Sequence, residues 1–111
     1  MGIQEWSQDV ILVNLAPEPQ MGEELDTVAD MARNRCDRSV VVDFSDVDII
    51  SSSSIAKLLK LHKLIKDSGK ELIFCGVSAR TKGLFEVVGL EKIFDFVDDT
   101  FIALAGLQLT T

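Results

Sequence analysis

Residues 40–55 read VVVDFSDVDIISSSSI, and this stretch decides the fold. The run Val40–Phe44 is short, apolar and rich in β-branched residues, which is typical of a buried strand. An amphipathic helix is predicted next, because apolar residues recur at helical spacing at Ile55, Leu58, Leu59 and Ile65. Four consecutive serines, residues 51–54, therefore lie at the junction between a strand and a helix.

Strands and helices alternate on both sides of this junction. Strand patterns occupy residues 3–6, 10–15, 71–77 and 93–96, and helix patterns occupy residues 23–36, 79–88 and about 98–107. The helix after the serines is expected to run to about Ser68 and to close at Gly69. Strand–helix–strand connections of this length favour parallel pairing, and the opening hairpin adds an antiparallel edge. The sequence thus predicts an α/β fold with a mixed, mostly parallel sheet of four to five strands and about four helices.

The composition is that of an ordinary globular chain, and residues 1–111 are expected to form one domain. The formal net charge of −7 argues against a nucleic-acid surface, which needs a basic stripe. No apolar run approaches the roughly 20 residues that span a bilayer, and no signal-peptide pattern opens the chain. A cytoplasmic protein is expected. Cys36 and Cys75 are far apart and form no CxxC pattern, so we expect reduced thiols and neither a metal nor a cofactor.

The four serines can be given different roles from local chemistry. If Ser51 is the N-cap, its hydroxyl accepts the N–H of Ser53 or Ser54. Ile50 and Ile55 then form the hydrophobic staple that fixes how the chain enters the helix. Ser52 becomes the first helical residue, and the cap does not use its hydroxyl.

A helix start of this kind suits an anion, including a phosphate on one of the serines. A phosphate on Ser52 would lie near Asp46 and Asp48, whose repulsion favours altered docking of a partner over local refolding. The alternative is purely structural: the serines cap the helix, and two of them are exposed residues without a further role.

Two segments resemble the STAS domain, the fold of bacterial anti-sigma factor antagonists. Residues 40–55 resemble the family's apolar strand, Asp-containing turn and Asp-Ser-Ser-Gly helix start, and residues 74–90 resemble its next strand and helix. The likeness covers roughly residues 10–104. Ser51 stands where the family usually has Asp, and Ser54 stands where it usually has Gly.

The resemblance implies a bacterial transcription regulator whose partner is an anti-sigma factor with serine kinase activity, with a phosphoserine phosphatase as a further candidate partner. By position, Ser52 is the serine that the kinase phosphorylates. The implied docking loop comprises Asp46, Asp48, Ser51, Ser53 and Ser54. The family also contains non-phosphorylated scaffold and transport-associated members, and an unphosphorylated scaffold or assembly subunit remains the alternative. A monomer or weak dimer is expected, with no nucleic acid or membrane bound.

The second helix offers a further candidate docking edge at Lys57, Lys60, Leu61 and Leu64, against the plainer interpretation of a solvated face. His62, the single histidine, is expected to be structural or interfacial. Trp6 and the six phenylalanines are expected to pack in the core and at its edges. No catalytic or nucleotide-binding motif is present, and serine hydrolysis would need a base near Ser52, so an enzyme is not expected.

Overall fold

The computed structural model describes residues 2–35 and 37–110, and its elements follow the predicted order. In chain order they are β1 (Gly2–Glu5), β2 (Val10–Asn14), α1 (Met21–Asn34), β3 (Ser39–Asp43), α2 (Ser52–Asp67), β4 (Leu72–Cys75), α3 (Ala79–Val87), β5 (Asp95–Val97) and α4 (Thr100–Thr110). The strands form one sheet in the order β1-β2-β3-β4-β5. β1 is antiparallel to β2 and the other neighbours are parallel, as predicted.

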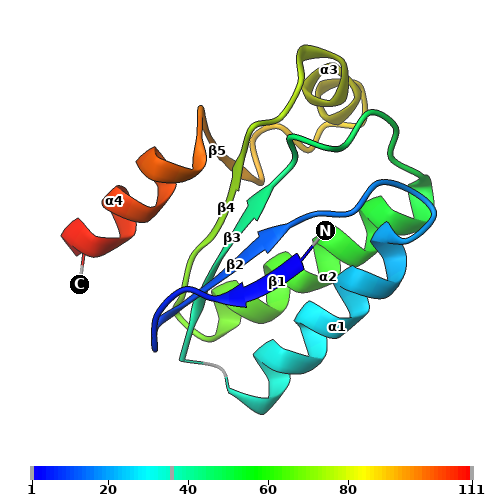
Figure 1. Cartoon of the computed structure of the whole chain (residues 1–111). Coiled ribbons are helices and arrows are strands. Elements are labelled where there is room, and N and C mark those ends of the chain that lie inside the picture. The colour runs from blue at the N-terminus through cyan, green and yellow to red at the C-terminus, as the bar shows by residue number, and fades with distance from the viewer. Residues whose placement is uncertain (1, 36, 111) are drawn as a thin grey trace.

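Helices cover both faces of the sheet (Figure 1). α1 and α2 lie side by side on one face, and α4 lies on the opposite face. α3 lies beyond the carboxyl ends of β3 and β4, next to the segment that enters α2. This end of the sheet is where open α/β folds place their functional groups.

β3 is apolar on both faces because each face meets a helix layer. Val40 and Val42 pack into the larger core with α1 and α2, whereas Val41 packs into a smaller core with α4. All three valines are fully buried. The larger core continues into an aromatic cluster at the end of the strand, where the ring of Phe74 lies 4.8 Å from that of Phe44 and 4.6 Å from that of Phe94.

The structure moves several predicted boundaries by one to three residues, and two of these shifts have a clear cause. α1 begins at Met21 instead of residue 23, because the fully buried Met21 side chain anchors the first turn in the core. β5 is Asp95–Val97 instead of residues 93–96, because Phe96 and Val97 are the residues in register with Phe74 and Cys75.

The expectation for aromatic residues was wrong at two positions: Trp6 is 46% exposed and Phe101 is 79% exposed. Cys75 is a buried free thiol, and burial raises its pKa despite a contact with the Thr100 hydroxyl at 3.3 Å. Cys36 lies outside the described residues.

Gly76 lets the chain leave β4 where β3 also ends. Its φ is +65°, a conformation that residues with a Cβ rarely adopt. A Cβ built there would lie 2.8 Å from Asp43 Oδ1 and 2.8 Å from Ser45 Oγ. These two side chains are already joined, because Asp43 Oδ1 accepts hydrogen bonds from the Ser45 backbone N–H and hydroxyl.

We therefore predict that Gly76→Ala lowers the free energy of unfolding by about 2 kcal/mol or more. The melting temperature should fall by roughly 10 °C, as measured by circular dichroism. Gly83→Ala is the matched control, since it lies within α3 and a Cβ there meets nothing within 4 Å. It should leave stability unchanged or raise it by up to about 1 kcal/mol. Equal effects of the two changes would contradict the role given to Gly76.

Candidate functional site

Ser51 caps α2, as the sequence predicts. Its backbone is extended (φ −83°, ψ 160°), and its hydroxyl accepts a hydrogen bond from the Ser54 backbone N–H at 3.1 Å. Ile50 is buried and Ile55 is partly buried in the same core, as the staple requires. α2 therefore begins at Ser52, and its entry angle is fixed from both sides.

A carboxylate from another segment also holds this helix start. Glu18, in the loop between β2 and α1, accepts a hydrogen bond from the Ser51 backbone N–H to Oε2 at 2.8 Å. Partial burial acts to raise the pKa of Glu18. Hydrogen bonds from the Ser51 backbone and from the Ser54 and Ser51 hydroxyls, together with the charge of Lys57, outweigh burial and lower it. The start of α2 thus already has one fixed negative charge, where the helix dipole favours it.

The four serines divide into two pairs. Ser52 and Ser53 are exposed, and neither hydroxyl has a hydrogen-bond partner among the residues that the structure describes. Ser54 is only 2% exposed, and its hydroxyl lies 3.3 Å from the Ser51 hydroxyl. The placement of Ser54 in a docking loop is therefore wrong, because its side chain is buried behind the cap. Ser52 is free as predicted, but so is Ser53.

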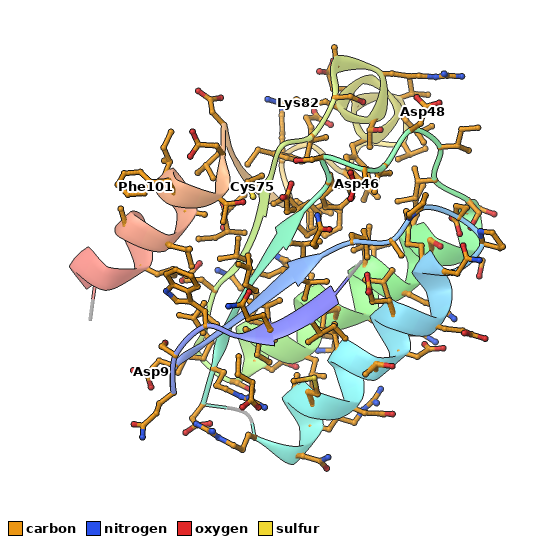
Figure 2. All side chains as sticks on the ribbon, viewed as in Figure 1. Asp9, Asp46, Asp48, Cys75, Lys82 and Phe101 are labelled. Atoms are coloured by element: carbon orange, nitrogen blue, oxygen red, sulfur yellow. The ribbon has the colours of Figure 1, made fainter. Side chains whose placement is uncertain are left out.

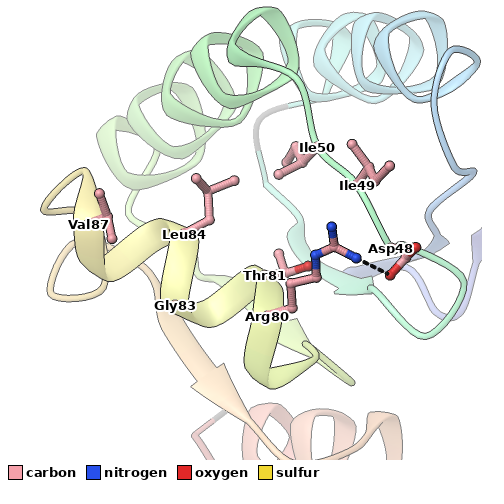
Figure 3. Close-up of a pocket in the computed structure, with 8 residues that line it drawn as sticks. All are labelled: Asp48, Ile49, Ile50, Arg80, Thr81, Gly83, Leu84 and Val87. Carbon is pink, nitrogen blue, oxygen red and sulfur yellow. Dashed lines mark ion pairs between the residues drawn. The ribbon is translucent and has the colours of Figure 1, made fainter.

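An apolar groove of about 360 Å³ lies between the segment that enters α2 and the outer side of α3 (Figure 3). Its lining residues are Asp48, Ile49, Ile50, Arg80, Thr81, Gly83, Leu84 and Val87. Ile49 on one wall is 62% exposed and Val87 on the other is 84% exposed. Large apolar groups left in solvent around a hollow often mark a protein-binding surface.

One ion pair crosses the groove. Arg80 Nη1 lies 3.6 Å from Asp48 Oδ1, and both side chains are well exposed. An exposed pair of this kind contributes at most about 1 kcal/mol, so a partner can displace it at small cost. Of the two predicted docking-loop aspartates, Asp48 thus lies in the wall of the groove. Asp46 is exposed on the turn that follows β3.

The predicted docking edge on α2 is wrong for most of its members. Leu61 is 1% exposed, and Leu64 is partly buried against the core. Lys57 turns toward α1, where its Nζ pairs with Asp26 Oδ2 at 2.9 Å. Lys60 alone is exposed. The lysines recur every three residues and so wind around the helix, and one side of that spiral faces α1.

Among the described residues, no histidine lies beside the serines to complete a catalytic set. His62 is ten residues further along α2 than Ser52, about 15 Å away by helical rise, and its ring packs edge-on against Phe94 at 5.5 Å. In residues 2–35 and 37–110, no group of three acidic, cysteine or histidine side chains is placed to hold a metal ion. No described helix is long and apolar enough to cross a membrane.

Sequence reasoning missed Glu18 and the groove. Glu18 is separated from Ser51 by 33 residues, and its only local signal is its position between Pro17 and Pro19. The groove had a clearer signal. The segment around α3 has more large apolar residues than one buried side of a short helix needs. Of Leu84, Phe85, Val87 and Val88, Phe85 is buried and the other three are exposed.

Glu18→Gln should lower the free energy of unfolding by about 0.5–1 kcal/mol at pH 7, allowing for partial exposure. Because the folded-state pKa of Glu18 is depressed, its contribution is present above the ordinary glutamate pKa of about 4.3 and is lost as pH falls through the folded value. The difference between wild type and variant should thus disappear in acid, as measured by urea unfolding at several pH values. Glu86→Gln, an exposed carboxylate on α3, is the control and should show no such difference. A gap for Glu18→Gln that is constant with pH would contradict this account.

The model of the STAS domain family matches residues 5–103. BtrV of Bordetella bronchiseptica, named as an anti-sigma factor antagonist, is 28% identical over 97 residues, which cover 87% of this chain and 80% of BtrV.

Solved structures agree on the fold. A Thermotoga maritima protein described as an anti-sigma factor antagonist superposes with a TM-score of 0.82 at 17% identity, covering 96% of this chain and 93% of that one. A STAS domain protein of Planctomyces limnophilus gives a TM-score of 0.79 at 20% identity, with 96% and 97% covered. Unphosphorylated SpoIIAA, an anti-sigma factor antagonist, gives 0.76 at 13% identity, with 96% of each chain covered. With its five-stranded mixed sheet, four helices and serine-capped α2, this chain belongs to the STAS domain family.

Proposed function

We propose that this chain is a non-enzymatic regulatory domain that binds an anti-sigma factor with serine kinase activity and is switched by phosphorylation of Ser52. The observation that carries the proposal is an exposed, unbonded Ser52 hydroxyl at the first residue of α2, next to an exposed apolar groove. Membership of the STAS family and the names of BtrV and SpoIIAA support a role as an anti-sigma factor antagonist.

The chain would supply only the phosphate acceptor. Ser52 Oγ attacks the γ-phosphate of ATP bound by the kinase, its proton passes to a base of the kinase, and ADP leaves. The acceptor must be solvent-exposed and on a rigid element. Ser52 meets both conditions, because the Ser51 cap and the Glu18 carboxylate fix the helix start beneath it.

A phosphate at Ser52 would add a charge of about −1.5 to −2. That charge arrives where Glu18 already occupies the Ser51 N–H, and Asp48 lies in the wall of the adjacent groove. Like charges therefore oppose any local ordering by the phosphate. The expected effect is weaker binding of a partner that covers both the serines and the groove, with little refolding.

The groove is the natural continuation of this docking surface. Ile49 lies three residues before Ser52 in the chain, and Leu84 and Val87 face it from α3. The proposed partner therefore covers exposed apolar side chains beside the acceptor serine. Asp46, Asp48, Ser51 and Ser53 are proposed to lie at the edge of this contact, and a phosphoserine phosphatase would act on the same exposed position.

The acceptor assignment is tested with the cognate kinase, ATP and phosphopeptide mass spectrometry. We expect phosphate on Ser52, none on Ser52→Ala, and wild-type incorporation on Ser53→Ala. Ser53 is the matched control because it is adjacent and also exposed. Phosphate found only on Ser53, or no phosphate while the kinase modifies a reference substrate, would overturn the assignment.

The alternative is an unphosphorylated STAS scaffold or assembly subunit. One observation favours it. Ser51 and Ser54 both take part in the cap of α2, so their presence is explained by structure alone. Binding of the partner by titration calorimetry separates the two functions. Under the leading proposal Ser52→Asp lowers affinity at least about tenfold, equivalent to about 1.4 kcal/mol. The scaffold function predicts unchanged affinity for Ser52→Asp, while Val87→Gln weakens binding in both cases.

A further inference from the structure

α4 has an apolar outer side that the fold does not use. The helix Thr100–Thr110 contains no charged residue, and Phe101 is 79% and Ile102 45% exposed. Figure 2 shows Phe101 directed away from the sheet. A helix that is apolar all round is normally buried, so an exposed one indicates a contact surface.

The core of the chain does not need these two side chains. The inner side of α4 is already filled by Ala103, Leu104 and Leu107, which pack on Val41 and Cys75 of the sheet. Among the described residues, α4 alone covers this face, and Leu12, Ile73 and Val97 beside it remain only partly buried. The outer side of α4 and its sheet margins thus form one largely apolar surface.

We propose that this surface binds a second copy of the chain, with the two α4 helices antiparallel about a twofold axis. Such an interface must be complementary to itself. Along the outer side of α4, the bulky Phe101 and Ile102 are followed one turn later by Ala105 and Gly106. A Cβ built at Gly106 meets nothing within 4 Å, so the space beside this position is open and a partner can approach the helix closely there. Antiparallel pairing places the large pair of each copy over the small pair of the other.

Charge favours the same occupant and the same orientation. The chain carries a net charge of −7, yet the proposed surface is uncharged, so two copies can meet there without opposing acidic groups. Asp98 and Asp99 precede α4. Parallel pairing would bring these aspartates together across the axis. Antiparallel pairing separates them by about the helix length of 16 Å, beyond the Debye length of about 8 Å at physiological ionic strength.

The proposed contact between the two α4 helices is small, so the dimer is expected to be weak. The outer side of one eleven-residue helix offers much less than the roughly 800 Å² per partner of a stable interface. We therefore expect a weak dimer, with a dissociation constant on the order of 100 µM. α2 lies on the other face of the sheet, so the dimer leaves Ser52 accessible, and the inference does not depend on the proposed function.

Sedimentation equilibrium from about 10 µM to about 1 mM tests the proposal. Wild type should associate reversibly to a dimer. Phe101→Gln should raise the dissociation constant at least about tenfold, and so should Gly106→Leu, which fills the open space at the proposed contact without touching the core. Val87→Gln is the matched control, because Val87 is also apolar and exposed but lies on α3, and it should dimerise like wild type. Circular dichroism establishes that each variant is folded.

Three outcomes would overturn the proposal. The first is a monomer at every concentration, which would indicate that another partner or solvent covers α4. The second is a dimer that Phe101→Gln leaves intact or that Val87→Gln weakens equally. The third is an unchanged dimer of Gly106→Leu, which is incompatible with close antiparallel packing at that position.

Discussion

The burial of β3 on both faces is the constraint on which the rest of the molecule depends. Val40, Val41 and Val42 have no exposed surface, because α1 and α2 cover one side and α4 the other. Polar side chains are therefore excluded from β3 until its end. There Gly76 lies close to Asp43 and Ser45, which are hydrogen-bonded to each other. The first exposed helix start after that point is α2. The location of the candidate site follows from the position of the central strand and needs no separate explanation.

The two departures from the usual STAS motif are structurally linked. A serine at position 51 caps α2 as an aspartate would, but without a charge. Glu18 supplies a carboxylate to the same helix start from the loop before α1. The extra hydroxyl of Ser54, at the position where the family usually has glycine, is buried 3.3 Å from the Ser51 hydroxyl, and it helps to lower the pKa of Glu18. Glu18 thus accepts from the Ser51 backbone N–H and Ser51 Oγ accepts from the Ser54 backbone N–H, so two donors at the start of α2 are paired.

Local sequence patterns were sufficient to predict the features that depend on neighbouring residues alone. Strand and helix periods gave the element order, Ser51 was identified as the cap, and Gly69 does close α2 with a φ of +75°. Contacts between distant segments were not accessible in this way. No pattern places Glu18 on Ser51 or α1 against Lys57, so Leu61 was predicted to be exposed although α1 and the sheet bury it. Phe101 was predicted to pack in the core or at its edges but is exposed. A hydrophobic pattern alone does not distinguish an apolar side chain that faces the core from one that faces solvent or a partner.

Apolar residues left in solvent are informative here because the core is complete without them. Phe85 anchors α3 to the aromatic cluster, and Leu104 and Leu107 anchor α4, yet both helices carry further large apolar side chains on their outer sides. In contrast, the outer sides of α1 and α2 are charged, with ion pairs such as Lys63–Asp67 and Arg33–Asp30. If simple composition explained the exposed apolar groups, they would be scattered over all four helices. Among the four helices, the large exposed apolar groups lie on α3 and α4, which carry one wall of the proposed partner groove and the proposed dimer surface.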